Sequence, residues 1–300
     1  AASDVYKRQM QVTPKLLKKI FKKREKRVHK GQFGKLGIVA GSKIYTGSPI
    51  LVGMAAYKTG CDLVYLIAPS RAANIAATYS PCLITFPLRN DFLSVKDVDP
   101  ILKFLKERRV NALVIGNGLG RRIETKQAIL ELIRKADLPL VLDADALRAL
   151  PLDLEVLKGK KAILLPHVNE FFELSGIKVE NNVEDRKRKV ENWLKKVKEK
   201  IDTEIVMVLK GYVDVVSNGE KTYLNKTGCN LMTKGGFGDT LAGICGALVA
   251  RKVDLFLAAC VATWLNGKAG ELTAKKLGES MLPTDLIENL YLIIKRFSSK

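Results

Sequence analysis

Residues 112–145 read ALVIGNGLGRRIETKQAILELIRKADLPLVLDAD, and this stretch decides the fold. The apolar run 112–115 ends in a glycine-rich loop, an amphipathic segment follows at 124–135, and the apolar run 138–142 ends at Asp143. Apolar runs without polar alternation, joined through a helix, are typical of neighbouring parallel strands that are buried on both faces. The stretch therefore predicts a βαβ unit of an α/β protein.

The same alternation of strand and helix extends in both directions. We expect further strands at 36–40, 63–68, 162–165 and 205–209, helices at 48–59 and 98–106, and a hairpin of 213–216 with 221–224 around Asn218-Gly219. The C-terminal third is predicted to be helical, at 240–250, 255–272 and 283–296. No repeat or Pro/Ser-rich linker interrupts the pattern, so residues 10–300 are predicted to form one domain. Residues 1–9 show no apolar periodicity and precede Met10, and we treat them as a non-native or disordered leader.

Composition narrows the class of protein. The chain is 47% hydrophobic, which is enough for a large core. Its five cysteines are scattered without a CxxC pair and only two histidines are present, which argues against a structural zinc site and indicates a reducing compartment. No apolar run has the length of a membrane span and no signal peptide is evident, so we expect a cytoplasmic protein.

The net charge of +20 raises the question of nucleic-acid binding. Residues 15–30 carry nine Lys or Arg and one Glu, and residues 186–200 have the spacing of an amphipathic helix with a solvated basic face. Neither block interleaves aromatic residues as a base-stacking surface would. A dedicated nucleic-acid function is therefore disfavoured, and the charge suits attraction of an anionic nucleotide equally well.

Polar residues follow five of the predicted strands directly. Because ligands bind at the carboxyl ends of strands in open parallel sheets, these residues are expected to converge on one site. The five clusters are Gly41-Ser42, residues 116–120, Asp143 with Asp145, His167 with Glu170, and Lys210-Gly211.

A glycine-rich loop, TKGGFGDTL at 233–241, precedes the predicted helix 240–250. The N–H groups of Gly235, Gly236 and Gly238, together with the positive end of the helix dipole, would bind an anion such as phosphate. Asp239 at this position is suited to deprotonate a hydroxyl that receives a phosphoryl group. The alternative is a loop that only caps the helix.

Two common nucleotide motifs are absent. In residues 116–122, GNGLGRR, the third glycine comes one residue too early for the GxGxxG fingerprint, which disfavours a hydride-transfer dehydrogenase. No GxxxxGK[ST] motif occurs, so the chain is not a P-loop enzyme.

Taken together, several blocks resemble the NAD(P)H-hydrate dehydratases. They are HKGQFG at 29–34, AGSKIYTGSP at 40–49, GNGLG at 116–120, DADAL at 143–147, PHVNEF at 166–171, LKG at 209–211 and GGFGDTL at 235–241. The resemblance spans nearly the whole chain. It implies a ribokinase-like three-layer sandwich with a central, mostly parallel sheet.

The resemblance also implies an activity. Enzymes of this family repair NADH or NADPH that has taken up water (NADHX, NADPHX), by phosphorylating the hydroxyl and eliminating phosphate. ADP serves as donor in most bacterial and archaeal members, and ATP in eukaryotic ones. A homo-oligomer is implied, and an NAD(P)H-hydrate epimerase on another chain would interconvert the epimers.

Site residues follow from the same resemblance. Asp239 would be the base and the N–H groups of Gly235, Gly236 and Gly238 would hold the phosphoryl group. Ser48, Gly118 and His167 would line the hydrated dinucleotide with Asp239. Lys210, Gly211, Tyr212, Val213, Asp214 and Gly238 would hold the nucleotide, and Glu170 would arrange Mg²⁺ through water.

Simpler roles for individual residues stay open. His167 would be a packed histidine, Lys210 a partner of a surface carboxylate, Glu170 a first-turn helix acid, and Asp145 the cap of a short helix at 146–150.

Departures from the family pattern leave two other functions open. Phe237 stands inside the glycine motif, where it faces either the phosphate or the helix packing, and Cys229-Asn230-Leu231 gives the preceding loop an unusual composition. One alternative is a ribokinase-like kinase of a thiazole or pyrimidine that keeps its phosphorylated product. The other is a non-catalytic nucleotide- or nucleic-acid-binding protein.

Overall fold

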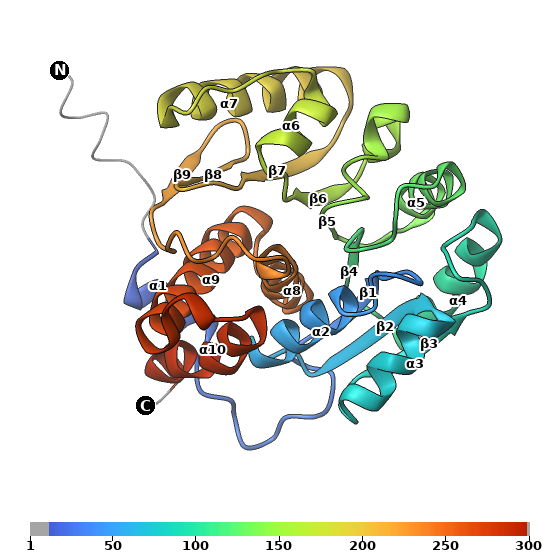
Figure 1. Cartoon of the computed structure of the whole chain (residues 1–300), viewed down its shortest axis with the longest axis horizontal. Coiled ribbons are helices and arrows are strands. Elements are labelled where there is room, and N and C mark those ends of the chain that lie inside the picture. Colours follow the sequence, from blue (N-terminus) through green and yellow to red (C-terminus); the bar gives the residue numbers. More distant parts are fainter. Residues whose placement is uncertain (1–11, 299–300) are drawn as a thin grey trace.

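A single sheet of nine strands organises the computed structural model, which describes residues 12–298 (Figure 1). The strand order is β3-β2-β1-β4-β5-β6-β7-β8-β9, parallel as far as β7 and antiparallel for the last two strands. The strands are β1 (Lys35–Val39), β2 (Leu63–Pro69), β3 (Ile84–Leu88), β4 (Ala112–Ile115), β5 (Leu140–Leu142), β6 (Lys161–Leu164), β7 (Glu204–Leu209), β8 (Asp214–Ser217) and β9 (Thr222–Asn225).

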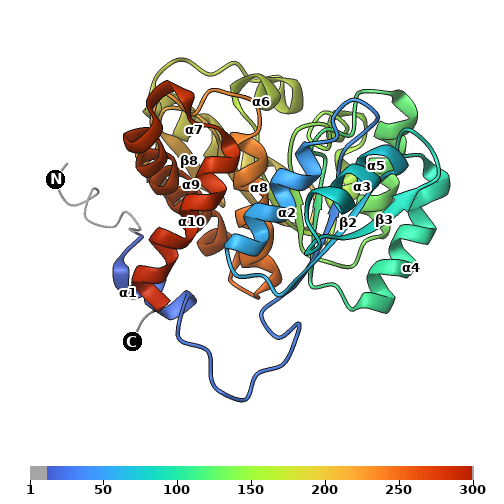
Figure 2. The same ribbon diagram turned by 60° about the horizontal axis from the view of Figure 1, so that its bottom comes forward.

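Helices cover both faces of this sheet, as Figures 1 and 2 show. The helices are α1 (Pro14–Ile20), α2 (Ser48–Lys58), α3 (Ser70–Tyr79), α4 (Val98–Arg108), α5 (Ile123–Lys135), α6 (Val168–Ser175), α7 (Val183–Lys200), α8 (Phe237–Ala250), α9 (Leu255–Leu277) and α10 (Pro283–Ser298). Short 3-10 segments lie at η2 (Val95–Asp97), η3 (Leu150–Leu152), η4 (Leu154–Leu157) and η5 (Gly278–Ser280).

Two hydrophobic clusters, one on each face, make this a three-layer sandwich. Along β4, Val114 packs into the cluster beneath α2, α3, α8, α9 and α10, whereas its neighbours Leu113 and Ile115 pack against α4, α5 and α7. Successive strand residues point to opposite faces, so a strand buried on both sides must be apolar throughout. The expected α/β architecture with a mostly parallel sheet is confirmed.

The element boundaries differ from the expected ones in a few places. The edge strand β3, with its sequence ITFPL, and the alanine-rich helix α3 were not predicted, and α9 runs to Leu277. Residues 146–150 form turns instead of the short helix considered for Asp145 as a cap. The basic segment 15–30 starts as α1 and continues as an exposed loop.

The predicted leader 1–9 lies outside the described residues. The prediction of one domain over 10–300 stays a prediction. None of the helices described between residues 12 and 298 is long and apolar enough to cross a membrane.

Candidate active site

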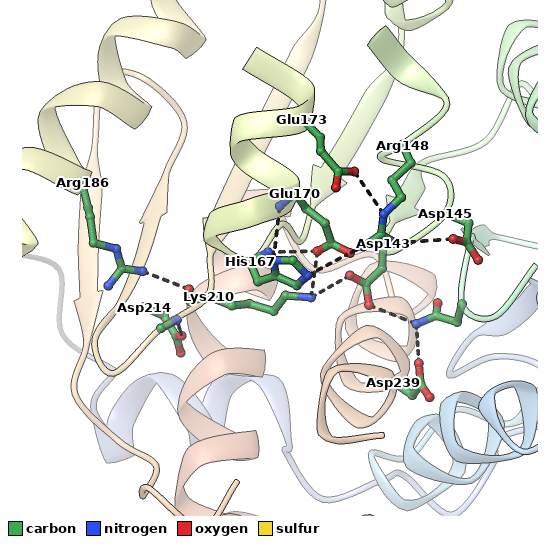
Figure 3. Close-up of polar contacts among 12 residues, drawn as sticks. Asp143, Asp145, Arg148, His167, Glu170, Glu173, Arg186, Lys210, Asp214 and Asp239 are labelled. Carbon is green, nitrogen blue, oxygen red and sulfur yellow. Dashed lines mark hydrogen bonds and ion pairs between the residues drawn. The ribbon is translucent and has the colours of Figure 1, made fainter. Parts of the chain in front are cut away.

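A chain of polar contacts joins the carboxyl ends of β4, β5, β6 and β7 to the start of α8 (Figure 3). Lys210 Nζ lies 2.8 Å from Asp143 Oδ1, and Asn117 Nδ2 donates to Asp143 Oδ2 at 3.0 Å and to Asp239 Oδ1 at 2.8 Å. Parallel strands place these residues at one edge, although Asn117 and Asp239 are 122 positions apart in sequence. Four of the five polar clusters predicted at strand ends therefore take part in one network or border it. The fifth cluster is connected to it through Gly41, whose N–H donates to the Asn117 carbonyl at 2.8 Å.

The start of α8 has the features of an anion site. Gly236 has φ +106° at the N-cap, a conformation that favours glycine, and no side chain caps the helix. A Cβ on Gly236 would lie 2.7 Å from Leu51 Cδ1, so the turn is also packed too closely for a side chain. The N–H groups of a first helical turn lack intrahelical partners, and at the start of α8 no side chain takes their place.

Phe237 turns its side chain into the hydrophobic cluster beneath α8 and is 4% exposed. Of the two orientations considered for it, the structure has the packed one. Its first-turn neighbour Gly238 presents its Cα toward the polar network, because a Cβ there would lie 3.6 Å from Lys210 Nζ.

Asp239, in the first turn of α8, has a raised pKa. Burial, and after it the nearby Asp143 carboxylate, raises the pKa of Asp239 to about 6. Hydrogen bonds from Asn117 and Ser48 and the charge of Lys210 act in the opposite direction. A carboxylate with a pKa near the working pH is an effective general base.

Lys210 pairs with a buried carboxylate, that of Asp143, and not with a surface one. Burial would lower its pKa, but the carboxylates of Asp143 and Glu170 outweigh burial and the net pKa is raised, so the side chain stays a cation. Asp143, with which it pairs at 2.8 Å, is buried.

His167 and Glu170 form a capping box at the start of α6, so Glu170 has the first-turn helix role considered for it, whereas the side chain of His167 is 46% exposed and is not that of a packed histidine. The His167 Nδ1 accepts from the Glu170 N–H at 3.2 Å, and Glu170 Oε2 accepts from the His167 N–H at 3.0 Å. Glu170 Oε1 also lies 3.1 Å from Arg148 Nη2. Burial lowers the pKa of His167, which favours the neutral ring.

These contacts bear on the expected Mg²⁺ site. Both oxygens of Glu170 already face protein cations or an N–H group, and among residues 12–298 no three His, Cys, Asp or Glu side chains are grouped to hold a metal. The residues do not fit a directly coordinated ion, and Asp145, which accepts from Gly120 N–H at 2.8 Å, is likewise engaged.

Two cavities flank this network. One, of about 620 Å³, is lined by His167, Lys210, Gly211, Tyr212, Asp214 and Gly238, and further by Cys229, Asn230 and Phe237. The other, of about 750 Å³, is lined by Ser48, Gly118 and Asp239 and by Tyr45, Arg121 and Arg148. The network of Lys210, Asp143, Asn117 and Asp239 thus connects two ligand-sized spaces.

The two cavities contain the predicted site residues with four differences, one of which is that Glu170, expected to arrange Mg²⁺, lines neither cavity. His167, expected beside the dinucleotide, lines the smaller cavity with the nucleotide residues. Val213 lines neither cavity, and its carbonyl accepts from Arg186 Nη1 at 2.9 Å. Gly235 and Gly236 also line neither, whereas Gly238 borders the smaller one.

Three residues of this region were missed by sequence reasoning. Asn117 is fully buried between two carboxylates, and Arg148 pairs with Asp145, Glu170 and Glu173. Arg186 belongs to a segment expected to have a solvated basic face, but it is 2% exposed and donates to the carbonyls of Leu209, Lys210 and Val213. Most of their partners are distant in sequence. The only signal in the sequence was the position of Asn117 itself, a polar residue directly after a predicted strand.

Comparison with known proteins agrees with this geometry. The family model for NAD(P)H-hydrate dehydratase matches residues 36–292. An ADP-dependent (S)-NAD(P)H-hydrate dehydratase of Nitrosopumilus maritimus is 37% identical over 291 residues, which cover 95% of this chain and 97% of the relative. A bifunctional NAD(P)H-hydrate repair enzyme of Hyperthermus butylicus is 40% identical over 267 residues, 88% of this chain and 49% of the relative, so the chain spans about half the length of such bifunctional relatives.

A solved structure agrees as well. The ADP/ATP-dependent NAD(P)H-hydrate dehydratase of Bacillus subtilis, co-crystallised with ATP and Mg²⁺, superposes with a TM-score of 0.76 at 26% identity, covering 95% of this chain and 98% of that one. The ribokinase-like architecture expected from the sequence is thereby confirmed. From its fold, its glycine-rich loop with Asp239 and these matches, the chain belongs to the NAD(P)H-hydrate dehydratase family.

Proposed function

We propose that this chain dehydrates (S)-NAD(P)H hydrate back to NAD(P)H at the expense of an adenine nucleotide. One observation carries the proposal: Asp239 borders the larger cavity, while its neighbour Gly238 at the start of α8 and Lys210 at the end of β7 border the smaller one. A phosphoryl donor and a hydroxyl acceptor bound in the two cavities would meet where a base, a cation and free helix N–H groups lie together.

The geometry supports a phosphorylation followed by an elimination. Asp239 takes the proton of the hydrate hydroxyl while the hydroxyl oxygen bonds to the terminal phosphorus of the nucleotide. The bond from that phosphorus to the bridging oxygen of the nucleotide breaks at the same time. Lys210 and the N–H groups at the start of α8 stabilise the charge on the transferred group. The electrons of the carbon–oxygen bond then leave with phosphate, the departing phosphate takes a proton from the adjacent carbon, and the electrons of that carbon–hydrogen bond form the restored double bond.

The nucleotide occupies the smaller cavity in this proposal, and the dinucleotide the larger one. The relatives' names support either donor: ADP for the Nitrosopumilus protein, and ADP or ATP for the Bacillus one. Since Glu170 is held by protein partners, Mg²⁺ would enter bound to the nucleotide phosphates and reach Glu170 only through water, and no step here depends on it.

The wider setting is also a proposal. An NAD(P)H-hydrate epimerase as functional partner is proposed on the family's likeness, and the bifunctional repair enzymes among the relatives are compatible with it. All five cysteines are unpaired, which supports the cytoplasm as compartment, and a homo-oligomer is proposed on the family's likeness alone.

The decisive experiment mixes the protein, Mg²⁺ and hydrated NADH or NADPH with ADP or ATP and follows the return of reduced-nicotinamide absorbance. Signal with one nucleotide, abolished in Asp239→Asn, supports the proposal and identifies the donor. Asp254→Asn is the matched control, because Asp254 also lies at a helix start but caps α9 outside both cavities. A stable phosphorylated product of another alcohol, without return of absorbance, would favour the kinase alternative.

A further inference from the structure

Asn117 holds two carboxylates apart at the centre of the site. It is fully buried at the end of β4, and its two amide hydrogens point to Asp143 Oδ2 at 3.0 Å and Asp239 Oδ1 at 2.8 Å. An ionised carboxylate only accepts hydrogen bonds, so a neutral group with two donors is what two adjacent carboxylates require. No other described side chain between residues 12 and 298 donates to both.

The backbone around Asn117 is shaped for this contact. Gly116 has φ +125° and Gly118 has φ +67°, and a Cβ on Gly116 would collide with the carbonyl oxygen of Asp143. Gly116 thus brings the ends of β4 and β5 closer than a side chain would permit, and Gly118 does the same for Tyr45 and Ser48. The Asn117 carbonyl, which accepts from Gly41 N–H at 2.8 Å, fixes the residue from a third strand end.

This placement has a cost that points to a role. Asn117 Oδ1 is buried without a hydrogen-bond partner, one of two such side-chain atoms among the described residues. An orphaned buried acceptor is disfavoured in a merely structural position, and exceptions of this kind concentrate at functional sites.

We infer that Asn117 is a positioning residue: it ties Asp239 to the Asp143–Lys210 pair, so that the base is oriented toward the acceptor hydroxyl and kept ionised. The inference rests on the proposed function. Through this bridge, the cation that faces the nucleotide cavity and the base that faces the other cavity share one rigid support. Binding of nucleotide beside Lys210 would thus find Asp239 already in place.

The charges around Asp239 determine which way the bridge acts. Burial and, after it, Asp143 on β5 raise the pKa of Asp239, while the hydrogen bonds from Asn117 and Ser48 and the charge of Lys210 on β7 lower it. Without the Asn117 donor, burial and the repulsion by Asp143 are offset less, so the proton binds more tightly. Loss of Asn117 is therefore expected to move the acid limb of activity to higher pH.

The test compares Asn117→Leu with the wild type over pH 5–9, using the dehydratase assay and nucleotide titrations. We expect kcat to fall about 10- to 100-fold, the KM for nucleotide to change less than about threefold, and the acid limb to rise by about one pH unit. Asn117→Ser, which keeps one donor, is expected to recover part of the rate. Asn111→Ala, at the other end of the same strand with its side chain on Lys35 N–H at 2.9 Å, is the control and should leave the limb in place.

The outcomes separate the inference from the proposed function. A wild-type protein without dehydratase activity refutes the proposed function, and the inference is then judged by carboxyl NMR titration of Asp239 in wild type and variant. If the wild type is active and Asn117→Leu loses the same fraction of the rate at every pH, so that its acid limb does not move, the positioning role is refuted. If Asn117→Leu does not fold, Asn117→Ser alone decides by the same criterion.

Discussion

The contact between Gly211 and Arg186 supports a specific prediction for residues 210–214, the loop proposed to hold the nucleotide. Arg186 donates hydrogen bonds to the carbonyls of Val213, Leu209 and Lys210 at 2.9, 3.1 and 3.0 Å, and it is 2% exposed. A Cβ on Gly211 would lie 2.6 Å from Arg186 Nη1 and 2.8 Å from Arg186 Cζ. Gly211 does not have a positive φ, so alanine at this position meets the guanidinium and not backbone strain.

The size of the effect follows from these distances. Ordinary contact begins at 3.4 Å, so the guanidinium must retreat by about 1 Å and lose one or two of its hydrogen bonds. A hydrogen bond to a charged group contributes about 1.5–3 kcal/mol, so Gly211→Ala should lower the free energy of unfolding by about 3 kcal/mol. Arg186→Met should cost about as much, because it leaves three carbonyls without their donor.

A double-mutant cycle provides the assay. In the Arg186→Met background, Gly211→Ala has no guanidinium to displace and should cost less than about 1 kcal/mol, giving a coupling of about 2 kcal/mol. Urea unfolding followed by tryptophan fluorescence measures each corner, and the KM for nucleotide should rise in both single variants because the loop lines that cavity. Gly47→Ala should be neutral, because Gly47 has φ −83° and a Cβ added there would meet no atom within 4 Å. Additive costs would refute the idea that Arg186 supports the loop through Gly211.

Three further predictions concern α8. Asp239→Asn should lower kcat about 10²- to 10⁴-fold while nucleotide binding by calorimetry persists, and the wild-type rate should fall as the pH drops through about 6, where Asp239 protonates; a flat profile there would exclude Asp239 as the base. The pKa of Asp239 is higher in the folded than in the unfolded protein, so the folded protein binds the extra proton between the two pKa values and loses stability as the pH rises through that window. Asp239→Asn should therefore raise the free energy of unfolding at pH 7 by about 1–3 kcal/mol. Chemical unfolding at pH 7 and pH 4 should show this gain only at the higher pH. Phe237→Ala should cost about 3–5 kcal/mol in thermal unfolding, since its ring is 4% exposed in the core cluster; a cost below 1 kcal/mol would mean that the ring faces the phosphate site instead.

Sequence reasoning performed unevenly, for identifiable reasons. Strands such as β4 and β7 are apolar on nearly every residue because helices cover both their faces, and this signal is local. The edge strand β3 contains Pro87 and has only one buried residue, so it lacks that signal. Arg186 lies within a run of lysines and arginines, and nothing nearby in sequence distinguishes a buried arginine from solvated ones.

The sequence by itself determined the alternation of the buried strands with helices, the polar residues at strand ends, and the glycines that precede Asp239, because periodicity, turn chemistry and helix starts depend on neighbouring residues. Only the tertiary structure decided that Asn117 donates to Asp239, that His167 faces the smaller cavity, and that Phe237 packs inward. These contacts depend on the order of the strands in the sheet and on which acceptor groups lie within hydrogen-bonding distance of each donor. Both are set by packing across the whole sheet, which no local stretch of the chain contains.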